Sequence, residues 1–262
     1  MNLSLTDKVA LVTGGSHGLG KAICLGLAAE GAKVVVHYYR SADQGVDLAA
    51  EADAVAGEIR RRTGVETLTV PGDVAREADV LEMFRLAVER FAHLDILVNN
   101  AGIWPTNYVK DMPEAEWSRT LRVNLTGTFL TCREMVRHLL AAGRPGRIVN
   151  VSSQAAFHGS TSGHAHYDAS KGGMITFTVS LAREVAPHGI AVNAVAPGMM
   201  YTEMTRDVLA DEQRTQKYIS RIPLRRIADP AEIADVVTLL ASEKAGYMTG
   251  ATVDVSGGML MR

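Results

Sequence analysis

The stretch Val9-Ala10-Leu11-Val12-Thr13-Gly14-Gly15-Ser16-His17-Gly18-Leu19-Gly20 joins a short apolar run directly to a glycine-rich turn. Residues 9–12 predict a buried strand, and residues 19–30 continue with the spacing of a helix. In the turn, Gly14 permits a tight reversal, Gly18 lets the backbone approach a phosphate, and Gly20 allows close packing of the helix. The stretch therefore predicts a strand, a turn and a helix whose N-terminal amides hold the pyrophosphate of a dinucleotide.

The rest of the chain repeats this alternation of strand and helix. Further strands are predicted at 33–36, 66–70, 95–98, 146–151, 191–195 and 252–255. Further helices are predicted at 80–91, 114–142, 167–186 and 230–242, and the alanine-rich, charged residues 41–63 predict a surface helix with an extended lead-in. Continuous apolar strands alternating with helices predict an α/β fold, a doubly wound parallel sheet of the Rossmann type. No linker or repeat divides the chain, so residues 1–262 are expected to form a single domain.

Composition excludes several classes of protein. The net charge of -2 offers no basic surface for nucleic acid, so no nucleic-acid partner is expected. No apolar run is long enough for a membrane span, and the N-terminus lacks the profile of a signal peptide. Cys24 and Cys132 lie in apolar helical patterns and have no metal-ligand spacing. We therefore expect reduced core cysteines, a cytoplasmic protein and no metal site.

A second motif, Tyr167-Asp168-Ala169-Ser170-Lys171, carries the chemistry. Its tyrosine and lysine stand at i and i+4 and share one face of a helix. There the ammonium is expected to lower the pKa of the phenol from its reference of ~10, which makes Tyr167 a general acid/base. Ser153 lies fourteen residues upstream. With the glycine-rich turn, this motif predicts hydride transfer between a nicotinamide and a carbonyl or alcohol.

Polar residues follow other predicted strands, where ligands of open α/β sheets bind. Asn99-Asn100-Ala101-Gly102 follows residues 95–98 and is interpreted either as a flank of the adenosine or as a polar turn. Asp73, followed by Val74, is interpreted either as an acceptor for the adenine amino group or as a turn residue. Pro197-Gly198 is expected to bring backbone close to the nicotinamide and to open a substrate lid around 199–225.

Together these segments resemble the short-chain dehydrogenase/reductase family over nearly the whole chain. The segments that carry the resemblance are Thr13-Gly14 to Gly20, Asp73, Asn99 to Gly102, Asn124, Ser153, Tyr167 with Lys171, and Pro197-Gly198. The resemblance implies cofactor contacts from Gly14, Ser16, His17, Gly18, Leu19, Gly20, Tyr38, Arg40, Asp73, Val74, Asn100, Ala101, Gly102, Tyr167, Lys171, Pro197, Gly198 and Thr202.

The resemblance also implies a role for each catalytic residue. Tyr167 would donate a proton to the carbonyl oxygen or take one from the alcohol, and Ser153 would hydrogen-bond the same oxygen. Lys171 would bind the nicotinamide ribose and favour the tyrosinate. Asn124 would hold a water that links Lys171 to solvent. Ser152 competes with Ser153, which is preferred because family members place the catalytic serine second in such a pair.

The expected cofactor is NADP(H) rather than NAD(H). Family members that use NAD end their second strand with an aspartate, and alignment places Tyr38 at that position. Arg40 and His17 could receive a 2′-phosphate, although Arg40 could instead be a solvated surface arginine.

The sequence leaves two substrate classes open. The polar segment 158–166, with His158, His164 and His166, and an apolar wall from Trp104 fit a sugar, polyol or hydroxy acid. Resemblance to 3-oxoacyl reductases is equally good, so we expect a 3-oxoacyl-type or small-ketone reductase, with an aldose or polyol (glucose-type) dehydrogenase as the alternative. A dinucleotide sensor without turnover is disfavoured, because the catalytic residues are all present.

The resemblance further implies a homotetramer, built from the helices near 114–142 and 167–186 and the last strand. The apolar C-terminal residues Met259, Leu260 and Met261 would be left partly exposed in a monomer.

Overall fold

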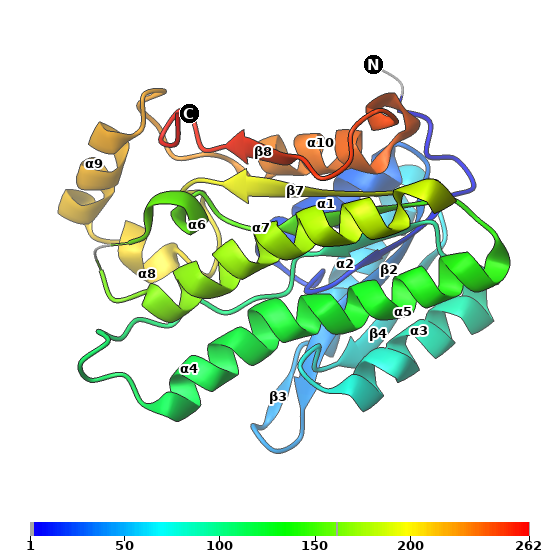
Figure 1. Ribbon diagram of the computed structural model, residues 1–262, viewed down its shortest axis with the longest axis horizontal. Helices are drawn as coiled ribbons and strands as arrows, with labels where there is room; N and C mark the ends of the chain where they lie inside the picture. The colour runs from blue at the N-terminus through cyan, green and yellow to red at the C-terminus, as the bar shows by residue number, and fades with distance from the viewer. Residues whose placement is uncertain (1–2, 161, 262) are drawn as a thin grey trace.

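A parallel sheet with helices on both faces forms the centre of the computed structural model, which describes residues 3–160 and 162–261 (Figure 1). Within those residues the strands are β1 (Val9–Val12), β2 (Lys33–Ser41), β3 (Val46–Asp47), β4 (Thr67–Gly72), β5 (Ile96–Asn99), β6 (Gly146–Val151), β7 (Ile190–Pro197) and β8 (Thr252–Val255). Their order is β4-β2-β1-β5-β6-β7-β8, all parallel, with β3 antiparallel on the end of β2. The predicted doubly wound sheet is confirmed. Parts of the predicted N-terminal, histidine-rich and C-terminal segments (Met1, Asn2, Thr161 and Arg262) lie outside the described residues.

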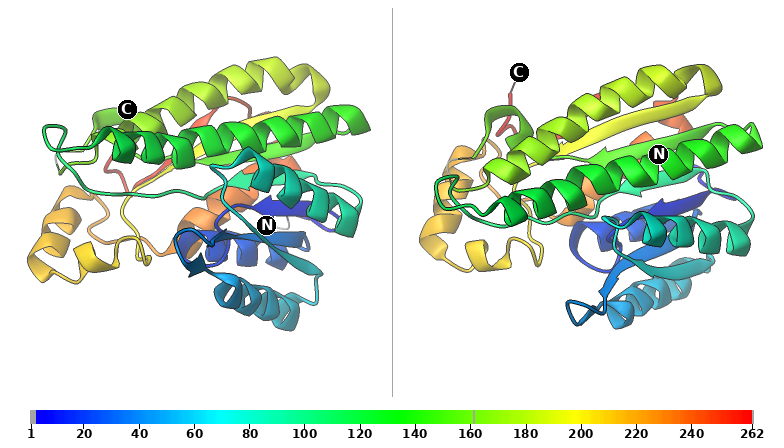
Figure 2. Two further views of the ribbon diagram at one scale, coloured as in Figure 1. Left: turned by 90° about the horizontal axis from the view of Figure 1, so that it is seen from below. Right: turned by 60° about the horizontal axis from the view of Figure 1, so that its bottom comes forward.

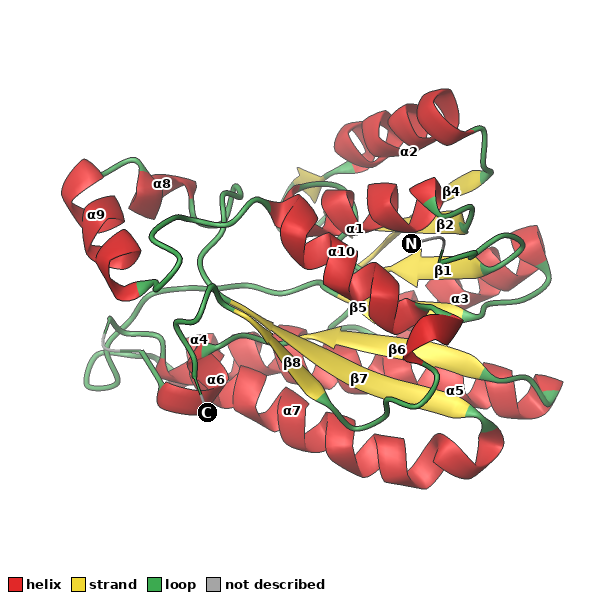
Figure 3. Ribbon diagram, turned by 90° about the horizontal axis from the view of Figure 1, so that it is seen from above, coloured by secondary structure: helices red, strands yellow, loops and turns green. Residues whose placement is uncertain are grey.

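Two layers of helices cover the sheet (Figure 3). The α-helices are α1 (Gly18–Ala29), α2 (Ala49–Thr63), α3 (Glu77–Phe91), α4 (Glu114–Leu121), α5 (Gly127–Ala142), α6 (Ala155–His158), α7 (Ala165–Val185), α8 (Arg206–Leu209), α9 (Glu212–Arg221) and α10 (Pro230–Ala241). Shorter helical turns are η1 (Arg122–Thr126), η2 (Ala186–His188) and η3 (Glu243–Ala245). Helices α1, α2 and α10 pack on one face, and α3, α5 and α7 pack on the other. No helix within residues 3–160 and 162–261 is long and apolar enough to cross a membrane.

The sheet has a hydrophobic core on each face, and successive side chains of β2 point alternately into one core and the other. Val34, Val36 and Tyr38 pack in the core beneath α1 and α2, whereas Val35 packs in the core beneath α3 and α5. Successive side chains of a strand point to opposite faces, so His37 and Tyr39 follow Val35. This alternation decides which end-of-strand residues can reach a ligand.

The predicted helix 114–142 is interrupted by the π-helical turn η1. In residues 41–63 the predicted extended lead-in is the end of β2 and the short strand β3, and the predicted surface helix is α2. Arg40 pairs with Asp47 across this hairpin, and α2 starts only at Ala49. The hairpin extends beyond the carboxyl end of the sheet (Figure 1).

The strand order creates a crevice where the connections diverge. β1 lies between β2 and β5. After β1 the chain continues into α1 on one face of the sheet, whereas after β5 it continues toward α5 on the other face. Ligands of open α/β sheets bind at such a switch point. Asn100, just after β5, donates its side-chain amide to the carbonyls of Thr13 and Gly14, each at 3.0 Å. These bonds tie the two loops on either side of the crevice together.

Candidate active site

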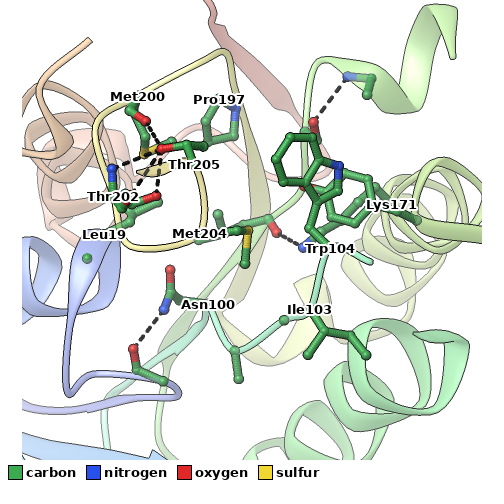
Figure 4. A pocket seen from close by; sticks show the side chains of 18 of the residues that line it. Leu19, Asn100, Ile103, Trp104, Lys171, Pro197, Met200, Thr202, Met204 and Thr205 are labelled. Atoms are coloured by element: carbon green, nitrogen blue, oxygen red, sulfur yellow. Dashed lines mark hydrogen bonds between the residues drawn. The ribbon is translucent and has the colours of Figure 1, made fainter. Parts of the chain in front are cut away.

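A cavity of about 670 Å³ occupies the crevice at the carboxyl ends of the strands (Figure 4). The glycine-rich turn lines one end, and Trp104 with Tyr167 and Lys171 lines the other. The segment after β7 borders it, where Thr205 Oγ1 donates to the carbonyl of Met200 at 2.6 Å and accepts from the amide of Thr202 at 3.0 Å. Helices α8 and α9 project beyond the sheet at this end of the molecule (Figure 2). They occupy the part of the chain for which a lid is predicted.

The glycine-rich turn packs its backbone tightly against the start of α1. Gly14 and Gly18 have φ of 63° and 52°, which favour glycine, and a Cβ on Gly20 would lie 1.9 Å from the carbonyl oxygen of Gly14. Helix α1 begins at Gly18 with no acidic residue in its first turn, and its N-cap residue His17 makes no side-chain cap bond. The first amides of α1 therefore lack a side-chain acceptor, and this arrangement fits a pyrophosphate.

The predicted residue Asp73 belongs to a polar cluster at the cavity, and the sequence did not predict its other members Arg119, Tyr39 and Gln44. Asp73 accepts the amide of Ala75 on Oδ1 at 2.9 Å and pairs with Arg119 through Oδ2 at 3.0 Å. Arg119 also donates to the hydroxyl of Tyr39 at 3.4 Å, and that hydroxyl donates to Gln44 at 2.9 Å. Asp73 is thus both a turn residue and a residue that lines the cavity. Both of its carboxylate oxygens already have protein partners.

Two residues expected at the cofactor do not line the cavity. Tyr38 is 7% exposed and packs in the core, and Arg40 is an exposed residue of the β2–β3 hairpin. His37 and Tyr39 line the cavity instead, as the alternation of β2 requires. His37 also braces the turn, because its Nδ1 accepts the amide of Gly14 at 3.0 Å. The alternation identifies Tyr39 only once the strand is known to continue past Val36, which the sequence did not predict.

The two neighbouring serines differ in what their hydroxyls contact. The hydroxyl of Ser152 donates to the backbone carbonyl of Lys171 at 2.9 Å. The hydroxyl of Ser153 hydrogen-bonds the phenol of Tyr167 and accepts the amide of Ala155 at 3.1 Å. Ser153 and Tyr167 therefore place two hydroxyls side by side at the cavity wall, where both could donate to one substrate oxygen.

Burial is the main cause of the pKa shifts of Tyr167 and Lys171. It raises the pKa of Tyr167 to about 12, although the hydrogen bond from Ser153 acts to lower it. It lowers the pKa of Lys171 to about 8. Lys171 Nζ donates to the carbonyl of Val151 at 2.7 Å and stands 5.7 Å from the centre of the Tyr167 ring. The expected lowering of the phenol pKa by Lys171 is not found in this structure, where burial raises that pKa, Ser153 acts to lower it and the charge of Asp168 acts to raise it.

Asn124 lies behind the cavity wall, in the π-helical turn η1. Its Oδ1 accepts the amide of Ile103 at 2.9 Å, and its Nδ2 donates to the Ile103 carbonyl and to Ser170 Oγ, each at 3.0 Å. Ser170 Oγ in turn donates to the carbonyl of Tyr167 at 2.6 Å. Asn124 thus ties the loop after β5 to α7. Its expected role in holding a water stays a prediction.

The far end of the cavity mixes aromatic, polar and sulfur-containing side chains. Trp104 stacks on His164 with ring centres 4.4 Å apart and meets the Tyr167 ring edge-on at 6.3 Å. His158 hydrogen-bonds Gln154, and both line the cavity. His166, in contrast, does not line it. Gln154 also lines this end and was not singled out from the sequence. The predicted lid 199–225 contributes Met199, Met204, Tyr218 and Arg221, and the C-terminal Met259 lines the cavity as well.

Most of the predicted site residues converge on this one cavity. Those that line it are Gly14, Ser16, His17, Gly18, Leu19, Gly20, Asp73, Val74, Asn100, Ala101, Gly102, Ser153, Tyr167, Lys171, Pro197, Gly198 and Thr202. In residues 3–160 and 162–261 no group of three or more His, Cys, Asp or Glu side chains is arranged to hold a metal ion.

Comparison with known proteins agrees with this arrangement. A family model described as enoyl-(acyl carrier protein) reductase matches residues 14–260. The 3-oxoacyl-[acyl-carrier-protein] reductase FabG of Staphylococcus epidermidis is 42% identical over 255 residues, which cover 97% of this chain and 100% of that protein. The chain belongs to the short-chain dehydrogenase/reductase family. It is accordingly an NAD(P)-dependent oxidoreductase that acts on C=O or CH–OH groups.

Solved structures of this family are similar over the whole chain. A putative gluconate dehydrogenase from Agrobacterium tumefaciens has a TM-score of 0.91 and 32% identity, and the match covers 100% of this chain and 99% of that one. A putative 2-deoxy-D-gluconate 3-dehydrogenase from the same organism, solved with bound NADP, has a TM-score of 0.86 and 35% identity over 100% of this chain and 99% of that one. The family and fold predicted from the sequence are confirmed.

Proposed function

We propose that this short-chain dehydrogenase/reductase is an NADP(H)-dependent reductase of 3-oxoacyl thioesters or small ketones. The observation that carries the proposal is the pair of hydroxyls on Ser153 and Tyr167 at the cavity wall. Two donors that converge on one oxygen suit a carbonyl, which gains charge on oxygen as it is reduced. The 42% identity to a 3-oxoacyl-[acyl-carrier-protein] reductase supports this substrate class.

Each catalytic side chain then has a distinct task. When bound, the nicotinamide supplies the hydride to the carbonyl carbon. Tyr167 donates its phenolic proton to the carbonyl oxygen, and the raised pKa in this structure keeps that proton available at neutral pH. Ser153 hydrogen-bonds the same oxygen and fixes its position. Lys171, one helical turn after Tyr167, holds the ribose of the cofactor and favours the tyrosinate that remains.

The expected preference for NADP(H) is kept, with a revised set of residues. Asp73 and Glu203 are the carboxylates that line the cavity among the described residues, and neither lies on β2. A 2′-phosphate beside the end of β2 would therefore meet Tyr39 and His17 rather than an acid. The similar 2-deoxy-D-gluconate dehydrogenase was solved with NADP. We expect kcat/KM to be higher with NADPH than with NADH.

A second candidate substrate is a sugar acid or polyol. The structural relatives include proteins described as gluconate and 2-deoxy-D-gluconate dehydrogenases, and the substrate end carries Gln154, His158 and the cation Arg221. Initial rates with acetoacetyl thioester and NADPH, beside rates with gluconate and NADP, separate the two. Thioester reduction supports the proposal, and turnover confined to gluconate or polyols replaces it with the second candidate.

We also propose a cytoplasmic homotetramer. Phe129 and Leu140 on α5 are 43% and 44% exposed, although both are large and apolar. A hollow lined by Ile175 and Val179 of α7 adjoins the edge strand β8. These surfaces coincide with the helices and strand for which contacts between subunits are expected. The unpaired, buried thiols of Cys24 and Cys132 suit a reducing compartment.

A further inference from the structure

The loop that carries Trp104 is fastened to the start of α7. The amide of Asn107 donates to the carbonyl of Gly163 at 2.8 Å. His164 Nδ1 donates to the carbonyl of Pro105 at 2.8 Å, and its ring stacks on Trp104. Three separate contacts thus join the loop after β5 to the residues just before Tyr167. The position of Trp104 in the substrate wall depends on this junction.

A buried histidine and a glutamate complete the junction. The side chain of His166 is fully buried, and its Nε2 lies 3.1 Å from Oε1 of Glu116 on α4. A carboxylate only accepts, so Nε2 carries the hydrogen. The other carboxylate oxygen of Glu116 accepts the side-chain amide of Asn107 at 3.3 Å. Glu116 therefore links the Trp104 loop to the residue immediately before Tyr167.

The chemistry of His166 is difficult to explain by packing alone. Its Nδ1 is buried and has no hydrogen-bond partner among the described residues. An unpartnered polar atom in the interior costs stability, and an apolar side chain would fill the same space without that cost. The feature that distinguishes the imidazole from an apolar side chain here is therefore the hydrogen bond made by Nε2. Its one hydrogen-bond partner within the described residues is Glu116.

We propose that Glu116 and His166 are positioning residues, which fix the placement of Trp104 relative to Tyr167 at the substrate end of the cavity. Trp104 meets the Tyr167 ring at 6.3 Å, so a shift of its loop changes the space beside the phenol. The inference rests on the proposed role of Tyr167 as the proton donor. It assigns no contact with substrate to Glu116 or His166.

Two substitutions of His166 distinguish the roles of its two ring nitrogens. Glutamine places an amide nitrogen near the position of Nε2 and can still donate to Glu116, whereas asparagine places one near Nδ1 and cannot reach it. We expect His166→Gln to keep kcat within about twofold and His166→Asn to lower it roughly 10- to 100-fold, as expected for a misplaced reacting group. Dissociation constants for NADPH should stay unchanged in both. Equal kcat values for the two variants would overturn the proposal.

Fluorescence gives a readout that does not need turnover. The chain has two tryptophans, so Trp117→Phe leaves Trp104 as the reporter. In that background, His166→Asn should raise acrylamide quenching of Trp104, and His166→Gln should leave it unchanged. If the parent lacks thioester activity but quenching separates the variants in this way, the proposed substrate is at fault and the positioning role stands. Quenching that is equal in the two variants contradicts the positioning role.

Glu116 provides the same comparison from the other side of the contact. Its side chain is 31% exposed, so substitution there is tolerated better than at the buried His166. Glu116→Gln keeps an acceptor for Nε2, and Glu116→Leu removes it. We expect the leucine variant alone to lower kcat and to expose Trp104. Should His166→Asn fail to fold, this pair decides the question, and equal behaviour of the two Glu116 variants would contradict the proposal.

Discussion

Ser152 and Ser153 have the same side chain and stand next to each other, yet their hydroxyls have different hydrogen-bond partners. The hydroxyl of Ser152 is bonded to the backbone of α7, and the hydroxyl of Ser153 is bonded to Tyr167. We expect Ser153→Ala to lower kcat by roughly 100-fold, because one of two donors to the substrate oxygen is lost.

Ser152→Ala is the matched control. It removes one buried hydrogen bond and should lower the free energy of unfolding by about 1 kcal/mol while kcat changes little. Steady-state kinetics and urea unfolding of both variants test the assignment. Equal losses of kcat would show that the two hydroxyls are not distinguished in this way.

Lys171 should leave a signature in the pH dependence of stability. Burial lowers its pKa from 10.5 to about 8. Between these values the unfolded chain holds a proton that the folded chain has lost, so the free energy of unfolding rises with pH, by at most about 1.4 kcal/mol per pH unit. Below about pH 8 both states are protonated and the penalty is fully present. Tyr167, with its pKa raised to about 12, opposes this trend only above ~10.

Urea unfolding of the wild type and of Lys171→Met, at about pH 8 and about pH 9.5, isolates this contribution. The wild type should gain more stability than the variant over this interval. Identical gains would mean that Lys171 is protonated in the folded protein throughout.

At the scale of single elements, the turn between β1 and α1 depends on the absence of one Cβ. A methyl group on Gly20 would meet the carbonyl oxygen of Gly14 at 1.9 Å, and backbone cannot move aside as a flexible side chain can. We expect Gly20→Ala to abolish dinucleotide binding and to lower the free energy of unfolding by roughly 2 kcal/mol or more. Fluorescence titration with NADPH and thermal unfolding measure the two effects.

Gly57→Ala in α2 is the control for helix propensity. Its Cβ would meet only the end of the flexible Arg61 side chain at 3.3 Å. Alanine is a better helix former by about 1 kcal/mol, so this variant should be at least as stable as the wild type and bind dinucleotide normally. If Gly20→Ala behaves in the same way, the close approach in the turn is not required.

The end of β2 shows where sequence patterns stop being sufficient. The apolar run 33–36 predicted a strand correctly but not its continuation to Ser41, because polar residues carry the strand onward and a hairpin with β3 stabilises them. Alignment placed Tyr38 at the position where family members that use NAD carry an aspartate, yet the alternation turns Tyr39 to the cavity. A pattern of apolar residues cannot report a hydrogen-bonded extension of this kind.

The break in the predicted helix 114–142 has a similar origin. Within η1, Asn124 makes three hydrogen bonds that reach Ile103 and Ser170, residues distant in sequence. Such tertiary contacts stabilise a π-helical turn that no local propensity encodes. The motif identified Asn124 as a site residue, but its bonding became visible only in the fold.

In the whole molecule, the sequence predicted the alternation of strands and helices along the chain and the doubly wound parallel sheet well. Glycine spacing and strand ends are local signals, and they brought most predicted site residues to one cavity. Arg119 was not predicted, because it reaches the cavity from α4 through packing between distant segments. Tyr218 and Arg221 lie within the predicted lid 199–225, but the sequence did not indicate that these two side chains of α9 would reach the cavity. Single charged or aromatic side chains on amphipathic helices give no local signal for such a position.

Assembly is also a property of the whole molecule. We expect light scattering to give a mass four times that of the chain, and Phe129→Arg on α5 to reduce it. Leu81→Arg on α3 is the control, since Leu81 is 46% exposed but lies outside the proposed contact surfaces. A monomeric wild type, or equal dissociation by both variants, would refute the proposed tetramer.

The role of Tyr167 as proton donor is tested by the initial rate of NADPH oxidation with an acetoacetyl thioester, measured for the wild type and for Tyr167→Phe. The phenylalanine variant keeps the ring that packs against Trp104 but lacks the phenolic proton. We expect turnover by the wild type and a loss of at least about 100-fold in kcat for the variant, with NADPH still bound. Undiminished turnover by Tyr167→Phe would contradict the assignment of Tyr167 as the proton donor, and with it the proposed mechanism.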